Sequence, residues 1–199
     1  MDTTLLEKFT IISIDRLGFG YSDFGKSEPN LANHAKLIGA ILEDFPNQKK
    51  LLVGHSMGGP TIAKVAMEYP QLVDGLILLA PSISPALEPS NTWRKALNWK
   101  LINVFAPDAL RICNQEIIPL KEELEMMMDG WKDITIPVTV IQGEKDPLVP
   151  KGNADFAKAM LENSSYVNIH KIKNGNHFIL WNRIPLIKKE MKAMLQQLN

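Results

Sequence analysis

Short apolar runs, separated by amphipathic stretches, dominate the hydrophobic pattern of the chain. Five runs have the length of strands, and they are either rich in β-branched residues or continuously apolar, as strands buried on both faces are. They are Phe9–Ile14, Leu51–Gly54, Gly75–Ala80, Val138–Gln142 and Tyr166–Ile172. Because strands covered on both faces are typical of parallel sheets, this pattern predicts a mostly parallel sheet.

Helical spacing of apolar residues follows or separates most of these runs. The predicted helices are Asn30–Phe45, Thr61–Tyr69, Asn153–Leu161 and Ile184–Leu198. In the first of them, Asn30 is a suitable N-cap and Pro46 ends the pattern. Short strands that alternate with helices predict the α/β class, with helices on both faces of the sheet.

One long interval interrupts the alternation. Residues 81–137 contain no strand-like run, but they hold several aromatic residues and a methionine triplet among charged residues. This composition predicts a helical cap inserted into a core formed by residues 1–80 and 138–199. Each large apolar side chain of the insertion is expected to serve ordinary helix packing. These side chains are Trp93, Trp99, Phe105, Trp131 and Met126–Met128.

Composition and charge exclude several classes of protein, among them nucleic-acid-binding, disulfide-rich and membrane-spanning proteins. The 199 residues suit one domain, and the 22 acidic residues balance the 22 basic ones. Without a long run of like charges, nucleic acid is not an expected partner. The single cysteine, Cys113, excludes an internal disulfide and is expected to pack. No apolar run approaches the ~20 residues of a membrane span, and no secretory signal is evident, so we expect a cytoplasmic protein.

The strongest chemical motif lies between the second apolar run and the helix after it. Residues 54–58 read Gly-His-Ser-Met-Gly, and the order of elements is strand, tight turn, helix. Such a turn projects the Ser56 hydroxyl, and glycines at 54 and 58 are expected because a Cβ there would crowd the strand and helix. The Met57 N–H would lie at a helix N-terminus, where it favours negative charge.

A serine nucleophile needs a base, and the base needs an acid that orients it. Asp146 follows the fourth apolar run and precedes Pro147, so it is expected to stay in the loop. His177 follows the fifth run, after a glycine turn. Since the carboxyl ends of parallel strands share one edge, Ser56, Asp146 and His177 are predicted to converge. Glu144 is the alternative acid, and Asp146 alone could instead cap the next helix.

The remaining histidines are given structural roles. His34 is expected to be solvated, His55 to pack beside the nucleophile, and His170 to lie within a strand away from the site. The four histidines and the lone cysteine show no metal-ligand spacing, so neither a metal nor a cofactor is predicted. The Gly-x-Gly of residues 18–20 lacks the third glycine of a dinucleotide fingerprint and is interpreted as a turn.

The chain resembles the α/β-hydrolase fold superfamily over nearly its whole length. The matching segments are Asp15–Ser22, Gly54–Gly59, Gly143–Pro150 and Gly175–His177, in the serine, acid, histidine order of that family. The resemblance implies Ser56 as nucleophile, His177 as general base and Asp146 as its orienting acid. It also implies that residues 81–137 occupy the position of the family's cap.

The front of the chain departs from that family. There, a strand and a His-Gly loop precede the segment that matches Phe9–Asp23, and the loop supplies the second oxyanion N–H. Here only eight residues precede Phe9. We therefore expect an N-terminally truncated fold. The central strand between Phe9–Ile14 and Leu51–Gly54 would be absent, unless the two pair directly or another chain donates a strand. Self-association through the unpaired edge is a further expectation.

The function predicted from the sequence is that of a serine hydrolase. It would cleave a carboxylic ester or similar small acyl substrate through an acyl-enzyme, with Met57 N–H as oxyanion donor. One alternative is a hydrolase-like binding protein, or fragment, without catalytic activity. Another is an acyltransferase or a hydrolase of carbon–carbon bonds that uses the same triad.

Overall fold

A four-stranded parallel sheet forms the centre of the protein in a computed structural model, which describes residues 7, 9–88 and 108–198. The strands are β1 (Leu51–His55), β2 (Gly75–Leu79), β3 (Val138–Gly143) and β4 (Val167–Ile172), and their order in the sheet is β1-β2-β3-β4. Every adjacent pair is parallel. All residues of β2 and β3 are buried, so the predicted continuously apolar strands and the α/β class are confirmed.

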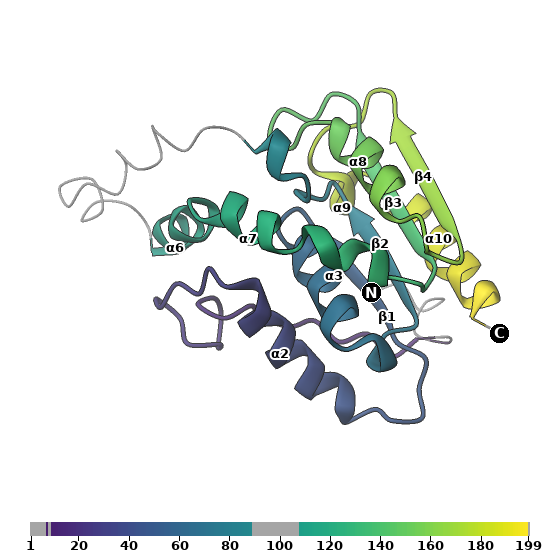
Figure 1. Ribbon diagram of the computed structural model, residues 1–199, viewed down its shortest axis with the longest axis horizontal. Coiled ribbons are helices and arrows are strands. Elements are labelled where there is room, and N and C mark those ends of the chain that lie inside the picture. Colours follow the sequence, from purple (N-terminus) through teal and green to yellow (C-terminus); the bar gives the residue numbers. More distant parts are fainter. Residues whose placement is uncertain (1–6, 8, 89–107, 199) are drawn as a thin grey trace.

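Helices cover both faces of this sheet (Figure 1). Side chains of α2, α3 and α8 pack with Leu76 and Leu78 of β2 on one face, whereas α9 and α10 pack against Ile77 and Leu79 on the other. This division follows the alternation of side chains along a strand. The helices are α2 (Leu31–Glu43), α3 (Gly58–Glu68), α6 (Asp108–Ile117), α7 (Leu120–Met126), α8 (Gly152–Met160), α9 (Ile179–Asn182) and α10 (Ile184–Gln197). Short 3-10 turns are η1 (Pro70–Leu72), η2 (Pro85–Leu87) and η3 (Met128–Asp133).

The second half of the predicted cap packs into the main core. Leu120, Leu124 and Met127 are buried in the cluster that also holds α2 and α3, and Trp131 stands edge-on to Phe156 of α8. Trp93, Trp99 and Phe105 lie outside the described residues. The division into a core and a cap therefore stays a prediction, although residues 120–134 clearly share the core.

The predicted strand Phe9–Ile14 is wrong. Residues 9–14 belong to no strand, and Ile11 and Ile12 are 51% and 47% exposed. A groove of about 790 Å³ is lined by this segment, by β1 and by apolar residues of α2. Apolar, β-branched composition permits a strand, but the ladder also requires a neighbouring backbone ~4.8 Å away. Among the described strands none lies beyond β1.

The free edge of β1 exposes its backbone to that groove. Ser56 N–H donates to Leu79 O, and Lys50 O accepts from Asp74 N–H, so these residues direct their backbone toward β2. Because N–H and C=O groups alternate sides along a strand, Val53 and His55 direct theirs away from β2. Val53 is itself 38% exposed. An edge of this kind favours pairing with a further strand.

Helix α2 shows one prediction confirmed and one corrected. The Asn30 side chain accepts hydrogen bonds from Ala32 N–H and Asn33 N–H at 2.8 and 3.1 Å, as expected of an N-cap. His34, however, is only 2% exposed, so the prediction that it is solvated is wrong. Its Nε2 lies 2.7 Å from the backbone oxygen of Glu28. The polar neighbours of His34 in sequence lie on the other side of the helix, which adjacent residues do not share.

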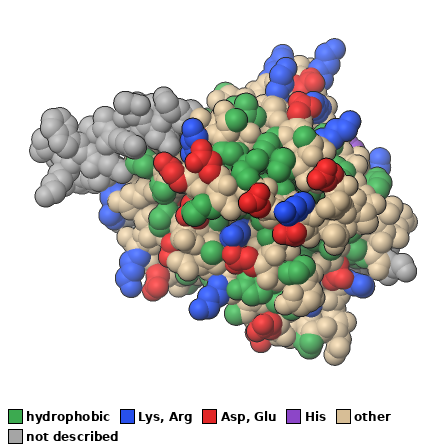
Figure 2. Space-filling view, in the orientation of Figure 1, with side chains coloured by type: hydrophobic (Ala, Val, Ile, Leu, Met, Phe, Trp, Pro, Cys, Tyr) green, Lys and Arg blue, Asp and Glu red, His purple; other side chains and the backbone are tan. Residues whose placement is uncertain are grey.

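The surface carries mixed charges. Lysine and arginine side chains alternate with acidic ones across the face seen in Figure 2, and no single sign dominates it. Within the ranges that the structure describes, no helix is long and apolar enough to cross a membrane.

Candidate active site

The turn that carries Ser56 joins β1 to α3, in the predicted order of strand, tight turn and helix. Ser56 directly follows β1, has φ = 54°, and precedes α3 by two residues. A positive φ is unfavourable for a residue with a side chain, so the surrounding contacts must hold it. Ser56 N–H donates to Leu79 O at 2.9 Å, and Ser56 O accepts from Gly59 N–H at 2.9 Å. Met57 N–H stands at the N-terminal end of α3, where the helix dipole favours an anion.

The glycines of the elbow differ from the prediction in one respect. A Cβ on Gly54 would collide with the backbone oxygen of Gly58, as expected. A Cβ on Gly58 would meet nothing within 4 Å, so the crowding predicted there is wrong. Gly59 is the second tightly packed position, because its Cβ would lie 2.5 Å from Pro81 Cβ. The five-residue motif alone does not show which glycine α3 presents to the loop after β2.

Asp146 and His177 are brought together from the loops after β3 and β4. His177 Nδ1 lies 2.9 Å from Asp146 Oδ2, and the two side chains are 8% and 0% exposed. The other carboxylate oxygen accepts from Leu148 N–H and Val149 N–H at 2.8 and 2.9 Å. Asp146 therefore orients a histidine and its own loop and does not cap α8. Glu144, the alternative acid, is exposed.

This pairing fixes the orientation of the imidazole. An ionised carboxylate only accepts hydrogen bonds, so the contact at Nδ1 requires a proton there. Nε2 is then the basic nitrogen, which a general base needs. Among the described residues no hydrogen bond joins Ser56 Oγ to His177. His55, which directly precedes Ser56, has its ring centroid 4.7 Å from that of His177.

His55 makes a contact that sequence reasoning missed. Its Nε2 lies 2.8 Å from the backbone oxygen of His177, and its ring stands edge-on to Trp181, with the centroids 5.4 Å apart. Burial lowers the pKa of His55 below its ordinary value of 6.5, which favours the neutral imidazole. The expected packing is present, but nothing in the local sequence indicates a bond to a residue so distant along the chain.

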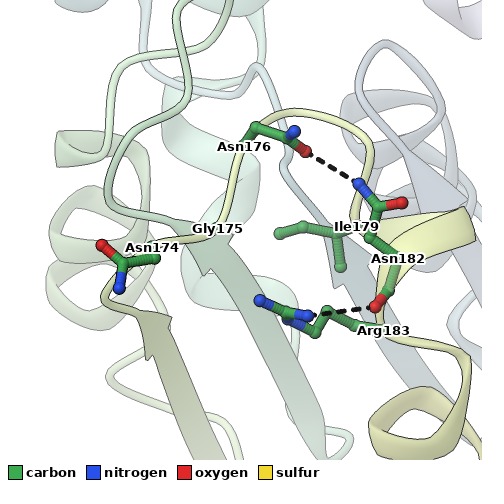
Figure 3. Close-up of a pocket in the computed structure, with 6 residues that line it drawn as sticks. All are labelled: Asn174, Gly175, Asn176, Ile179, Asn182 and Arg183. Carbon is green, nitrogen blue, oxygen red and sulfur yellow. Dashed lines mark hydrogen bonds between the residues drawn. The ribbon is translucent and has the colours of Figure 1, made fainter.

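The loop that carries His177 is held on both sides. Asn176 Oδ1 accepts from Phe178 N–H at 3.0 Å and from Asn182 Nδ2 at 3.1 Å, and the second contact is drawn in Figure 3. Gly175 O accepts from Lys145 N–H at 2.9 Å, which docks this loop on the loop of Asp146. Figure 3 shows Gly175, Asn176, Asn182 and Arg183 around a small pocket. Its volume is about 280 Å³.

No metal site accompanies this arrangement within the described part of the chain, where no group of three or more His, Cys, Asp or Glu side chains could hold an ion. His170 lies in β4, as its position in an apolar run indicated, and contacts Glu190 at 3.2 Å. It is therefore not part of the pair formed by Asp146 and His177.

Comparison with known proteins gives the family. A model of the alpha/beta hydrolase fold matches residues 1–101, which is half of the chain. The chain belongs to the alpha/beta hydrolase fold family. A lipase-esterase related protein from Clostridium acetobutylicum shares the fold of this hydrolase-family chain, with a TM-score of 0.70 and 18% identity over 96% of this chain and 86% of that one. A monoacylglycerol lipase from Paleococcus ferrophilus is similar, with a TM-score of 0.67 and 18% identity over 92% and 80% of the two chains.

Curated relatives agree with this family. A putative esterase/lipase of Mycoplasma pneumoniae is 27% identical over 80% of this chain and 64% of its own length. The serine hydrolase BPHL of Mus musculus is 22% identical over 86% of this chain and 64% of its own. The chain thus spans 64% of the length of these relatives. One of them is named as an esterase/lipase and the other as a serine hydrolase.

Proposed function

We propose that this protein is a serine hydrolase that cleaves a carboxylic ester, or a similar small acyl substrate, through an acyl-enzyme. Ser56 would be the nucleophile, His177 the general base and Asp146 the acid that orients it. The observation that carries the proposal is the buried contact between His177 Nδ1 and Asp146 Oδ2. A serine in a strained turn, as Ser56 is, needs a base oriented in this way to become a nucleophile.

The proposed reaction has two stages. In the first, His177 Nε2 takes the hydroxyl proton as Ser56 Oγ attacks the carbonyl carbon of the substrate. Met57 N–H donates to the oxyanion, and the imidazolium, stabilised by Asp146, returns its proton to the departing alcohol. In the second, water attacks the acyl-Ser56 ester with the same base, and the carboxylic acid leaves.

Esters are preferred as substrates because the named relatives include an esterase/lipase. Transfer of the acyl group to an acceptor other than water, or cleavage of a carbon–carbon bond, would use the same three residues. Product analysis distinguishes these reactions once activity is established.

A hydrolase-like binding protein without catalysis is the competing function. The observation that favours it is the groove beside β1, next to an elbow for which we assign one oxyanion donor. Loss of one such donor typically lowers turnover by ~10²–10³. A serine hydrolase with one oxyanion donor would therefore be slow but faster than its Ser56→Ala variant, whereas an inactive binding protein would show the same rate as that variant.

The experiment is labelling with a fluorophosphonate probe, together with hydrolysis of p-nitrophenyl acetate. We expect labelling of the wild type and of Ser13→Ala, which changes an exposed serine, but not of Ser56→Ala. Hydrolysis should fall to the background rate in Ser56→Ala alone. Equal rates for wild type and Ser56→Ala, in samples with the same circular dichroism spectrum, would support the binding protein instead.

A further inference from the structure

We infer that His55 is a positioning residue. Its hydrogen bond connects the end of β1, which precedes the nucleophile Ser56, to the loop that carries the base His177. The inference rests on the proposed function of Ser56 and His177. His55 directly precedes Ser56, and its Nε2 is 2.8 Å from the backbone oxygen of His177. The His55 side chain therefore connects the backbone next to Ser56 with the backbone of His177.

The sheet supplies only an indirect connection between these two segments. Ser56 follows β1 and His177 follows β4, and the order β1-β2-β3-β4 places two strands between them. A small displacement at each strand pair would accumulate across the sheet. The hydrogen bond of His55 bypasses β2 and β3, so it can limit that displacement where the reacting groups meet.

The free edge of β1 makes this connection more important. Within the described strands β1 pairs with β2 alone, and the groove lies along its other side. The carboxyl end of β1 is thus held by one ladder, by the turn into α3 and by His55. Without His55, the turn would lose this hydrogen bond to the loop that carries His177.

The geometry of the bond suits a restraint. His177 O also accepts from Ile179 N–H at 2.9 Å, so both lone pairs of this carbonyl are used. The His55 ring is packed between His177, 4.7 Å away between centroids, and Trp181 at 5.4 Å. An imidazole held on two sides can fix the position of its partner more firmly than a free side chain can.

A pair of nearly isosteric variants separates the hydrogen bond from the packing. His55→Gln keeps an N–H donor of similar reach, whereas His55→Met keeps the bulk and loses the donor. We expect His55→Met to lower kcat for p-nitrophenyl acetate about 10- to 100-fold with KM within about 2-fold, because misplacement by ~1 Å has effects of this size. His55→Gln should recover at least a third of wild-type kcat. The rate of fluorophosphonate labelling should follow kcat.

His34→Met is the control for loss of a buried imidazole. His34 also contacts a backbone carbonyl, that of Glu28 at 2.7 Å, but it lies on α2. This variant is expected to lose at least as much thermal stability as His55→Met, while kcat stays within 2-fold of wild type. Equal kcat in His55→Met and His55→Gln would overturn the inference, whichever value they share.

Crystal structures of the two His55 variants test the inference independently of activity. We expect the distance from Ser56 Oγ to His177 Nε2 to change by about 1 Å or more in His55→Met and to stay within 0.3 Å of wild type in His55→Gln. An unchanged distance in both variants contradicts the role of His55. If the wild type hydrolyses no faster than Ser56→Ala, the proposed function fails, and these distances still decide whether His55 positions the loop.

Discussion

Asp146 makes more hydrogen bonds than a surface aspartate needs. Its carboxylate accepts from His177, from Gln142 Nε2 at 3.3 Å and from two backbone N–H groups. The backbone bonds hold the side chain in place, so that one oxygen is always directed at the imidazole. This residue is consequently the best test of whether the charge of the acid, rather than its shape, supports the reaction.

We predict that Asp146→Asn lowers kcat by about 10³-fold or more, because an amide cannot hold the imidazole in the required tautomer or stabilise the imidazolium. The variant should fold, since the amide oxygen can still accept from Leu148 and Val149. Ester hydrolysis and circular dichroism measure the two effects. Glu144→Gln is the control and should leave kcat within 2-fold; a larger loss there than in Asp146→Asn would reassign the acid.

A second buried carboxylate lies away from the site. Glu116 is fully buried, and its Oε2 lies 2.7 Å from Nη1 of Arg16, while Oε1 has no partner among the described residues. Burial raises the pKa of Glu116 above its ordinary value of 4.5, although Arg16 opposes the shift. The native state therefore binds the proton of this carboxyl more tightly than the unfolded chain does.

The sign of the resulting pH dependence follows from linkage. A raised pKa contributes stability that is fully present below pH 4.5 and is lost as the pH rises through the pKa of the folded protein. Glu116→Gln has no such titration. We predict that the free energy of unfolding of wild type, relative to Glu116→Gln, decreases from pH 4 toward neutrality. Urea unfolding at several pH values measures it, and a difference that increases with pH would contradict the prediction.

At the scale of elements, α3 depends on how closely its first turn approaches other backbone. Gly54 and Gly59 are tightly enclosed, by Gly58 O and Pro81 Cβ respectively, while Gly58 faces open space. We predict that Gly54→Ala and Gly59→Ala each destabilise the fold by about 1–3 kcal/mol through overpacking. Gly58→Ala should be neutral or stabilising by up to ~1 kcal/mol, because alanine is the better helix former. Thermal and urea unfolding of the three variants would show whether their order is as stated.

Helix α2 depends instead on its N-cap. Asn30 Oδ1 satisfies two N–H groups that otherwise lack a partner in the first turn. Asn30→Ala is predicted to lower the free energy of unfolding by about 1 kcal/mol. The exposed Asn47, which follows the helix, provides the control substitution Asn47→Ala. Similar effects of the two substitutions in urea unfolding would show that the cap contributes nothing specific.

At the scale of the whole molecule, the free edge of β1 is the feature with the widest consequences. Its backbone groups and the Val53 side chain border the groove, and a strand edge of this kind favours association with another strand. We predict that the protein associates at high concentration and that Val53→Lys reduces the association, because a charge on an edge strand opposes pairing. Size-exclusion chromatography at several concentrations measures this.

Phe24→Lys provides a control of equal charge at an exposed loop position. If Phe24→Lys reduces association as much as Val53→Lys does, the effect comes from net charge and not from the edge of β1. A monomer at all concentrations would show that this edge is not a self-association surface. Either result leaves the active-site proposal unchanged, because that proposal rests on the loops after β1, β3 and β4.

Local sequence determined much of this protein. Continuous apolar runs fixed β2 and β3 because both faces of these strands are buried, and Asn30 fixed the start of α2 through its own side chain. Gly-x-Ser-x-Gly indicated the elbow because only a glycine fits at position 54. The positions of Asp146 and His177 after consecutive strands predicted their approach, since parallel strands end at one edge of a sheet.

Contacts between distant segments decided the rest. Residues 9–14 have the composition of a strand, but among the described residues they pair with no neighbouring backbone. His34 is buried because of what packs on α2, and His55 reaches a carbonyl 122 positions along the chain. Which glycine is crowded, 58 or 59, depends on the path of Pro81. Hydrophobic periodicity indicates which side of each segment faces a core. The burial of His34, the bond of His55 and the crowding of Gly59 depend instead on which other segment packs against them, and only the tertiary structure determines this packing.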